Sequence, residues 1–486
     1  MTTRPDRSHL NTYQIVESLW KHLGLPPKAL SSLIFQGEGF GLSSSFRITE
    51  VAQATIGLSA LTAAQFHALR ENCSVPRVRV DQENAVLEFK SVNLYTLNGR
   101  PPSVESHPIG EYHKTADGRV LIHDSFKHHI QAALDILCLP WDATLEEIDR
   151  KILQWKSADL EAAGMRRGAV IAALRDYNGW DSMPQGKVVY ENPILIRKIT
   201  NGPPVLLKHL PKGQKKCLRG IRVVDMTHVI AGPLAGRTLA AHGADVLWIT
   251  SPHMERLPAA DLDCSRGKRA AQLDLNREKD RVTLHSILKE AHVWINGYRP
   301  GGMESKGFSV EAVCARSTRG IICASMSAWG SQGPWSRQRG FDSIIQTASG
   351  GFVSEAEHFG AGESMRYLPT QILDYAAGFL LATGITAALC KQAEEGGSYA
   401  VEVSLAGTMD FVRSLGQHPD KRWFQLPNPR WQGEVSNPNV FETHQTSFGE
   451  LRSVKHAATI EGLEVGYERI PEPQEYRAVK PPRSVI

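Results

Sequence analysis

From Leu218 onward, short apolar runs rich in β-branched residues alternate with stretches whose apolar residues recur every three or four positions. The apolar runs predict strands at 220–227, 244–250, 270–276, 292–298 and 320–327. The stretches between them predict helices at 234–243, 279–291 and 308–317. Such alternation is typical of right-handed crossovers and of a mainly parallel sheet covered on both faces. The sequence therefore predicts an α/β fold with a Rossmann-like large domain.

The first part of the chain has a less regular pattern. Helical periodicity occurs at 13–23, 60–72 and 126–137, and apolar alternation at 78–92 and 118–124 predicts strands. This mixture indicates a smaller α+β domain. The basic segment 206–216, which contains Pro and Gly, is the predicted linker. We therefore expect two domains, residues 1–217 and 218–486.

The apolar run at 375–390, YAAGFLLATGITAALC, has 16 uncharged residues. A membrane span needs about 18 to 20, so this run predicts a buried helix. The start of the chain, MTTRPDRSHLNTYQ, has no apolar signal-peptide core. From these two patterns we expect a cytoplasmic protein with no membrane partner.

Composition narrows the class of protein further. The 486 residues include 55 Lys and Arg against 51 Asp and Glu, a net charge of +4 that is too small to indicate a nucleic-acid partner. The seven cysteines include no CxxC pair, which favours free thiols over a disulfide framework or a zinc site. The first strand-to-helix turn, THVIAGPLAGR, lacks both GxGxxG and GxxxxGK[ST], so NAD and P-loop binding are not expected.

Six segments of the second part carry a family resemblance. They are LRGIRVVDMTHVIAGPLAGRTLAAHGADVLWITSP (218–252), RGKRAAQLDLN (266–276), NGYRPGGMESKGFS (296–309), SMSAWGSQGPW (325–335), RGFDSIIQTASGGF (339–352) and ILDYAAGFLLATGITAAL (372–389). In this order they resemble motifs of the family III CoA-transferases, the CaiB/BaiF type. That group includes formyl-CoA and carnitine CoA-transferases and the α-methylacyl-CoA racemases.

The first part resembles the same family in a different order. GEYHKTADGRVLIHDSF (110–126) and GWDSMPQG (179–186) resemble the two ends of the family's small domain, which normally follows the large domain. Here the small-domain segment, about 100–200, precedes a large-domain start. Our hypothesis is a shortened tandem, in which residues 1–217 supply the small domain and 218–486 supply most of the large one.

Asp374 stands directly before the long apolar run, so local sequence alone predicts a helix N-cap. The resemblance implies a further role, because it places here the carboxylate that attacks an acyl-CoA thioester. The family's chemistry passes through an aspartyl acyl anhydride and an aspartyl-CoA thioester. The implied function is a CoA-transferase acting between an acyl-CoA and a free carboxylic acid, with coenzyme A as substrate and no metal, nicotinamide or flavin.

The resemblance also implies which residues contact CoA, whose phosphates require cations and whose thioester arm requires an apolar surface. The implied contacts are Ile230, Ala231, Arg266, Lys268, Arg269, Leu273, Tyr298 and Arg299. Without the resemblance, the basic run at 266–269 is typical of a solvated surface patch, and Ile230 is typical of core packing.

Two alternative functions stay open. The racemases of the family move the proton α to the thioester with a His–Asp pair, but the family's histidine position holds Phe341 here, followed by Asp342. Phenylalanine cannot transfer a proton, so a transferase is favoured over an acyl-CoA racemase or other isomerase. The third hypothesis is a non-catalytic CoA-binding relative.

Because family III enzymes are interlocked homodimers, the resemblance also implies a homodimer.

Overall fold

The computed structural model describes residues 4–103 and 106–471. Its centre is a seven-stranded sheet with the strand order β10–β9–β8–β11–β12–β13–β7. The strands are β7 (Leu195–Thr200), β8 (Arg222–Met226), β9 (Asp245–Thr250), β10 (Lys268–Gln272), β11 (Val293–Asn296), β12 (Ile322–Ser327) and β13 (Ser398–Ser404). All neighbours pair in parallel except β13 and β7. The predicted α/β class and mainly parallel sheet are confirmed.

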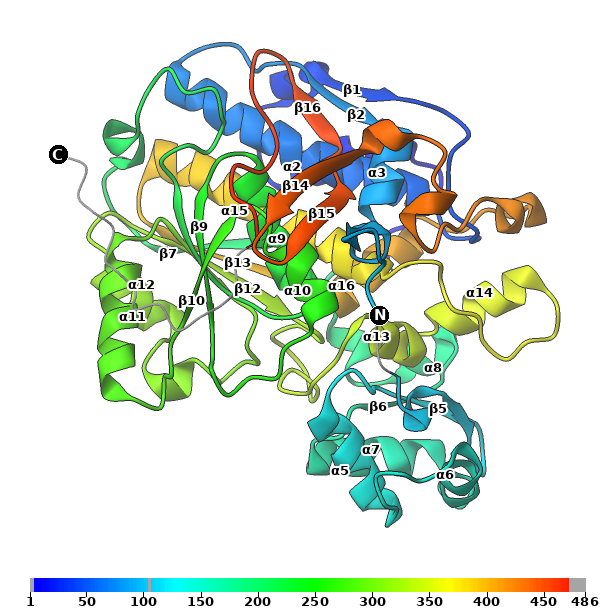
Figure 1. The fold of residues 1–486 in the computed structure, drawn as a ribbon. Coiled ribbons are helices and arrows are strands. Elements are labelled where there is room, and N and C mark those ends of the chain that lie inside the picture. Colours follow the sequence, from blue (N-terminus) through cyan, green and yellow to red (C-terminus); the bar gives the residue numbers. More distant parts are fainter. Residues whose placement is uncertain (1–3, 104–105, 472–486) are drawn as a thin grey trace.

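Helices cover both faces of this sheet (Figure 1). Successive side chains of a strand point to opposite faces of the sheet, so Val223 and Val224 of β8 each pack against a different layer of helices. Val223 packs in the core that contains α9 (Ala231–Ala241) and α15 (Ile372–Glu395). Val224 packs in a second core with α11 (Glu278–Glu290) and α12 (Val310–Arg316). The sheet is therefore apolar on both sides, as its strand sequences predict.

The helix α15 is the central element of the larger core. Its 24 residues have a mean hydropathy of 1.6 in the most apolar window, enough by length and composition to cross a membrane. That window is completely buried within the protein, against α2 (Ile48–Glu71), α9 and β13. The prediction of a buried helix is therefore confirmed, although the helix extends beyond 375–390 at both ends.

A similar order of elements occurs around α2 and around α15. Both α2 and α15 have 24 residues, begin with Ile, and carry an acidic residue at the third position, Glu50 and Asp374. Each helix is followed by a strand whose last residue caps the next helix. Asp81 at the end of β2 (Val78–Asp81) caps α3 (Gln82–Glu88), and Ser404 caps α16 (Leu405–Ser414). The shortened tandem of two related units stays a prediction.

Residues 112–173, in the middle of the first part, form a separate lobe at the bottom of Figure 1, called the small lobe below. A three-stranded antiparallel sheet, β4–β5–β6, packs against three helices around its own apolar core. These elements are β4 (Tyr112–Lys114), β5 (Arg119–Ile122), α5 (Lys127–Leu137), α6 (Leu145–Ile152), α7 (Ser157–Arg167) and β6 (Ile171–Ala173).

Two further three-stranded sheets, β1–β2–β16 and β14–β15–β3, join the start of the chain to its end. Their strands are β1 (Leu33–Gln36), β3 (Thr96–Leu97), β14 (Phe441–Thr446), β15 (Gly449–Val454) and β16 (Ala458–Ile460). The remaining α-helices are α1 (Thr12–His22), α4 (Ser91–Leu94), α8 (Tyr177–Ser182), α10 (Pro258–Cys264), α13 (Asp342–Ser349) and α14 (Gly351–Phe359).

The structure corrects one local prediction. The apolar alternation at 78–92 predicts a strand, but the strand ends at Asp81 and two short helices follow. The physical reason is helix capping, since the Asp81 carboxylate accepts a hydrogen bond from the Asn84 backbone at 3.1 Å.

The two expected parts of the chain share a core. The strand β7, from the first part, forms the edge of the main sheet, and α2 packs against α15. The boundary near residue 217 stays a prediction.

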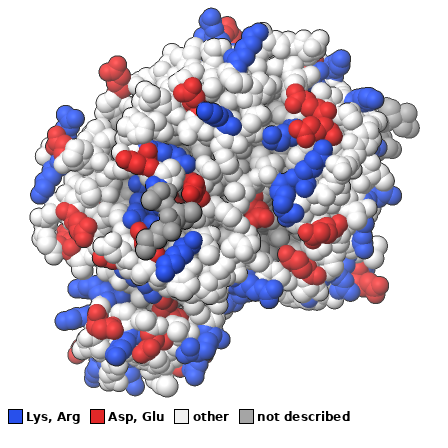
Figure 2. Space-filling view, turned by 180° about the vertical axis from the view of Figure 1, so that it is seen from behind, with Lys and Arg blue, Asp and Glu red and all other residues white. Residues whose placement is uncertain are grey.

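On the face shown in Figure 2, acidic and basic side chains are interspersed rather than gathered by sign.

Candidate active site

Asp374 is the third residue of α15, and its side chain is 7% exposed. The prediction that it is the N-cap is wrong, because Gln371 occupies that position. Asp374 lines a cavity of about 300 Å³. Helix α15 therefore presents this carboxyl from its first turn to this cavity.

The cavity lies at the carboxyl ends of β8, β11 and β12. Its walls include the turn 227–232 after β8, the turn 297–300 after β11, and residues 326–328 at the end of β12. The lobe of the first part adds Phe126, His128 and His129. Ligands of open parallel sheets bind at this end of the strands, because several strand-to-helix turns meet there.

Four of the predicted CoA contacts lie at this cavity together with Asp374. Ile230 and Ala231 come from the turn between β8 and α9, and Tyr298 and Arg299 come from the turn after β11. The turn after β8 is strained, because Val229 has a φ of 72°, which is costly for a β-branched residue. A strained backbone beside a candidate nucleophile is typical of a functional turn.

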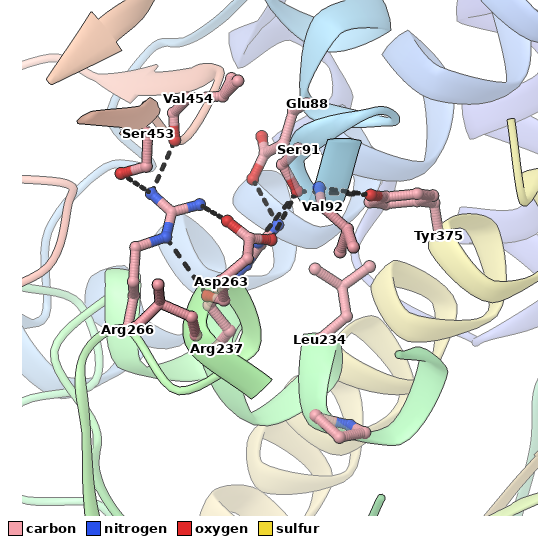
Figure 3. Close-up of polar contacts among 12 residues, drawn as sticks. Glu88, Ser91, Val92, Leu234, Arg237, Asp263, Arg266, Tyr375, Ser453 and Val454 are labelled. Atoms are coloured by element: carbon pink, nitrogen blue, oxygen red, sulfur yellow. Dashed lines mark hydrogen bonds and ion pairs between the residues drawn. The ribbon is translucent and has the colours of Figure 1, made fainter. Parts of the chain in front are cut away.

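The other four predicted contacts lie among protein partners. The guanidinium of Arg266 donates to the Val454 carbonyl at 2.7 Å and pairs with Asp263 at 2.7 Å (Figure 3). Lys268 pairs with Asp225, and Arg269 pairs with Asp245. Leu273 packs in the apolar core beneath α11. The structure does not bring these four to the cavity. Their contact with CoA stays a prediction.

Asp342 is a residue of the site that the analysis of the sequence missed. Its Oδ2 accepts hydrogen bonds from the backbone N–H groups of Leu373 at 2.8 Å and Asp374 at 3.2 Å. Asp342 therefore satisfies the free N–H groups at the start of α15, which a cap residue normally does. The signal was present in the sequence, because Asp342 directly follows Phe341 in a recognised motif.

The two carboxyl groups influence each other's protonation. Burial raises the pKa of Asp342 to about 6. Burial, and then the negative charge of Asp342, raise the pKa of Asp374 well above its usual value. A desolvated carboxylate next to a second one is a stronger base and nucleophile than a solvated one.

Two histidines of the small lobe lie at Phe341, the position where the family's racemases have their histidine. The ring of His123 stacks on Phe341 with centroids 3.8 Å apart. The Nδ1 atoms of His123 and His129 are 3.2 Å apart, within hydrogen-bond distance. Burial lowers the pKa of His123 to about 3, and that of His129 to about 2 with help from nearby histidines and arginines. Both rings are therefore neutral at physiological pH.

A buried polar network ties the first turn of α15 to the first part of the chain (Figure 3). The Tyr375 hydroxyl accepts a hydrogen bond from the Val92 backbone at 3.0 Å. Nearby, Ser91 donates to Asp263 at 2.7 Å, and Arg237 pairs with the same carboxylate. Since Tyr375 follows Asp374 in sequence, this network holds in place the turn of α15 that carries the candidate nucleophile.

Comparison with known proteins identifies the region that carries this site. Residues 218–446 match the family described as CoA-transferase family III. This region of the chain, just under half of its length, is similar to that family. Asp374 and four of the predicted CoA contacts at the cavity lie within it, so the resemblance read from the sequence is confirmed.

Curated relatives of family III include transferases and a racemase. An acetyl-coenzyme A transferase, nodX, from Hypoxylon pulicicidum is 29% identical over 67% of this chain and 58% of its own length. A formyl-CoA:oxalate CoA-transferase from Streptomyces coelicolor is 32% identical over 39% of this chain and 48% of its own. An alpha-methylacyl-CoA racemase from Mus musculus is 29% identical over 52% of this chain and 66% of its own length. The chain thus spans about half to two thirds of these relatives.

Proposed function

We propose that this protein is a CoA-transferase that moves CoA between an acyl-CoA thioester and a free carboxylic acid. The observation that carries the proposal is the position of Asp374, which lines a cavity at the carboxyl ends of three parallel strands. The family III region and its CoA-transferase relatives support the same conclusion.

In the proposed first half-reaction, the Asp374 carboxylate attacks the thioester carbonyl. The C–S bond breaks, CoA leaves as a thiolate, and a mixed aspartyl acyl anhydride forms. The thiolate then attacks the aspartyl carbonyl of this anhydride. The donor acid leaves as a carboxylate, and an aspartyl-CoA thioester remains.

In the second half-reaction, the acceptor carboxylate attacks the aspartyl-CoA thioester and displaces the thiolate, which forms a new mixed anhydride. The thiolate attacks the acyl carbonyl of that anhydride, so the acyl-CoA product leaves and the Asp374 carboxylate is restored. Each step exchanges one activated acyl bond for another. The residues around Asp374 bind and orient the substrates, with Arg299 as a cation at the cavity.

The test is exchange of labelled CoA between an acyl-CoA and free acids, followed by mass spectrometry of the enzyme. We expect exchange, together with hydroxylamine- or borohydride-sensitive labelling of Asp374 in the peptide 366–391. Labelling at a different residue would contradict the mechanism, and absence of exchange with a broad panel of acids would contradict the function.

An acyl-CoA isomerase is the second candidate, and the neutral histidine pair favours it. His129 lines the same cavity as Asp374, so a neutral base and a carboxyl group face one cavity. Such a pair could exchange the proton α to a thioester. Incorporation of solvent deuterium at Cα without CoA exchange would support this function over the transferase. Absence of both activities would favour a non-catalytic CoA-binding protein.

We also propose a cytoplasmic homodimer. Within one chain, the small lobe already supplies Phe126, His128 and His129 to the cavity that contains Asp374. The dimer proposed here is therefore an association of chains whose cavities each contain both parts. Sedimentation at micromolar concentration tests it, because a particle with the mass of one chain would contradict a dimer.

A further inference from the structure

The turn 227–232, which connects β8 to α9, forms one wall of the cavity that contains Asp374. Val229, in the middle of this turn, has a φ of 72°, a conformation that is costly for a β-branched residue. Such strain persists only where the surrounding structure holds the backbone in place. The contacts at the two ends of the turn therefore decide the shape of this wall.

The start of the turn is held by two neighbouring strands. The hydroxyl of Thr227 donates a hydrogen bond to Oδ1 of Asp225 on β8. The carbonyl of Thr227 accepts a second one from the indole N–H of Trp248 on β9, at 2.9 Å. All three residues are at most 2% exposed, so water does not compete for these hydrogen bonds.

Lys268, the first residue of β10, joins the two ends of the turn. Its ammonium group donates to Oδ2 of Asp225 at 2.8 Å and to the Pro233 carbonyl, in the first turn of α9, at 2.6 Å. The Nζ atom also lies 5.4 Å from the centre of the Trp248 ring. One buried cation therefore connects β8 to the beginning of α9 and closes the turn between them.

The two ends of the turn are also in direct contact. A Cβ atom added at Gly232 would lie 2.6 Å from Cβ of Thr227, and one added at Gly236 would overlap Oδ2 of Asp225. Both glycines belong to α9, so this helix begins against the carboxylate that pairs with Lys268. The turn is therefore packed into its shape as well as hydrogen-bonded.

The first turn of α9 also contacts the helix that carries Asp374. A Cβ atom added at Gly378 would lie 2.8 Å from the Ala231 carbonyl oxygen. Gly378 follows Asp374 by four residues, so the two lie on the same face of α15. A shift of the turn would therefore move Ile230 and Ala231 relative to the candidate nucleophile.

The energetics of the Lys268–Asp225 pair argue against a role in stability alone. Both side chains are 0% exposed, and the cost of removing two charges from water offsets much of their mutual attraction. Two apolar residues of similar size would fill the same space without that cost, but they would not hold the Pro233 carbonyl. The pair therefore supplies a geometry that an apolar core would not provide.

We propose that Lys268 is a positioning residue of the candidate site, which holds the turn 227–232 in the shape that the reaction at Asp374 requires. It acts through Asp225 and Pro233 rather than by contact with substrate, because its side chain is fully buried. The proposal rests on the proposed CoA-transferase function and adds a residue to it. The chemical steps are those given above, because Lys268 neither gives nor takes a proton in them.

The first test is the kinetics of Lys268→Met, with the acyl-CoA and acid that give exchange in the wild type. Methionine keeps the length of the side chain and removes its charge. kcat should fall about a hundred-fold, because a small misplacement of reacting groups is costly. The dissociation constant of free CoA, measured by calorimetry, should change by less than about three-fold.

Arg222→Met is the matched control for this test. Arg222 also pairs with a carboxylate, that of Glu290 at 3.3 Å, but it lies at the opposite end of β8 from the turn. Removal of its charge should leave kcat and the dissociation constant of CoA unchanged.

A second variant separates positioning from folding. Lys268→Met leaves the Asp225 carboxylate buried without its partner, which by itself lowers stability. Combining it with Asp225→Asn removes both charges and keeps an oxygen for the Thr227 hydroxyl. The thermal midpoint of this double variant should return towards that of the wild type. Its kcat should stay low, because the Pro233 carbonyl has still lost its donor.

The third test does not depend on turnover. The backbone N–H of Leu234 donates to the Ile230 carbonyl at 2.8 Å, across the junction of the turn and α9. In the double variant, hydrogen exchange of this amide should be about ten-fold faster than in the wild type, because the turn opens more often. Mass spectrometry of peptides that cover 228–240 measures the rate, and Arg222→Met should not change it.

The outcomes separate this proposal from the proposed function. If the wild type gives no CoA exchange, the proposed function fails, while faster hydrogen exchange at Leu234 still supports the hold of Lys268 on the turn. A loss of CoA affinity as large as the loss of turnover would overturn the proposal, because it indicates direct contact with CoA. Full recovery of kcat in the double variant, or an unchanged rate at Leu234, would overturn it as well.

Discussion

At the scale of single residues, the candidate site is a pair of carboxyl groups rather than one. Asp374 provides the proposed nucleophile, and Asp342 holds the start of α15 through two backbone N–H groups. Both have a pKa raised by burial. Protonation of the pair, more than its geometry, therefore sets the pH range in which the carboxylate of Asp374 can react.

Replacement of Asp374 by Asn tests the nucleophile. Turnover should fall by about a thousand-fold or more, because the amide cannot form the anhydride. Binding of CoA should persist. The pKa of this carboxyl is higher in the folded protein than in the unfolded chain. Its ionisation therefore lowers the free energy of unfolding as the pH rises above the pKa that the carboxyl has in the unfolded chain. The thermal midpoint of Asp374→Asn at neutral pH should therefore equal or exceed that of the wild type, and near-normal exchange would exclude the proposed role.

Replacement of Asp342 by Asn tests the coupling between the two carboxyl groups. The Asn oxygen can still accept the N–H groups of Leu373 and Asp374, while the negative charge is removed. Since that charge raises the pKa of Asp374, its removal should lower this pKa. The acidic limb of the profile of kcat/KM against pH should move to lower pH. Asp342→Ala is the contrasting variant and should lose about 1 kcal/mol of stability with the cap; an unchanged limb in Asp342→Asn would contradict the coupling.

At the scale of elements, the site depends on close packing of α15 against α9. A Cβ atom added at Gly378 would lie 2.8 Å from the Ala231 carbonyl oxygen and 2.8 Å from the Leu234 side chain. Ala231 is also part of the cavity wall. A side chain at Gly378 would therefore push apart the two helices whose first turns form the cavity.

The variant Gly378→Ala tests this contact. Alanine favours a helix interior over glycine by about 1 kcal/mol, so helix propensity alone predicts stabilisation. We expect the opposite, a loss of about 1 to 3 kcal/mol, because overpacking between helices outweighs the propensity. Thermal or urea unfolding measures the change. A raised midpoint would show that α9 and α15 can separate without strain, against the close contact described here.

At the scale of the whole molecule, the two parts of the chain depend on each other. Nearly all of α2 is buried, and it packs on α15 in one continuous core with the main sheet. The first part also supplies β7, the segment 89–92 beside Asp374, and three residues of the cavity. Neither part alone can bury these apolar surfaces.

Expression of residues 1–217 and 218–486 as separate polypeptides tests this dependence. Each fragment alone should be insoluble or only partly folded, because it exposes the α2–α15 interface. When co-expressed, the two should copurify through a tag on either one and recover CoA exchange. A well-folded 218–486 fragment with a cooperative melt of its own would contradict a shared core.

The sequence alone determined the features that depend on neighbours in the chain. The alternation of apolar runs predicted five of the seven strands of the main sheet, because strand and helix periodicity are local properties. Motifs located Asp374, and placed Ile230, Ala231, Tyr298 and Arg299 on turns that follow β8 and β11. Parallel strands bring such turns to one edge of a sheet, so these residues could be grouped without coordinates.

Only the tertiary structure decided which charges are free and which distant residues meet. Arg266 and Lys268 stand in a basic run, yet both are buried, Arg266 against the Val454 carbonyl at the end of β15 and Lys268 against Asp225 of β8. His129 gave no signal in the sequence, because it reaches the cavity of Asp374 from a segment more than two hundred residues earlier in the chain. Burial and pairing of a charge depend on the packing of remote segments, which a local sequence pattern does not contain.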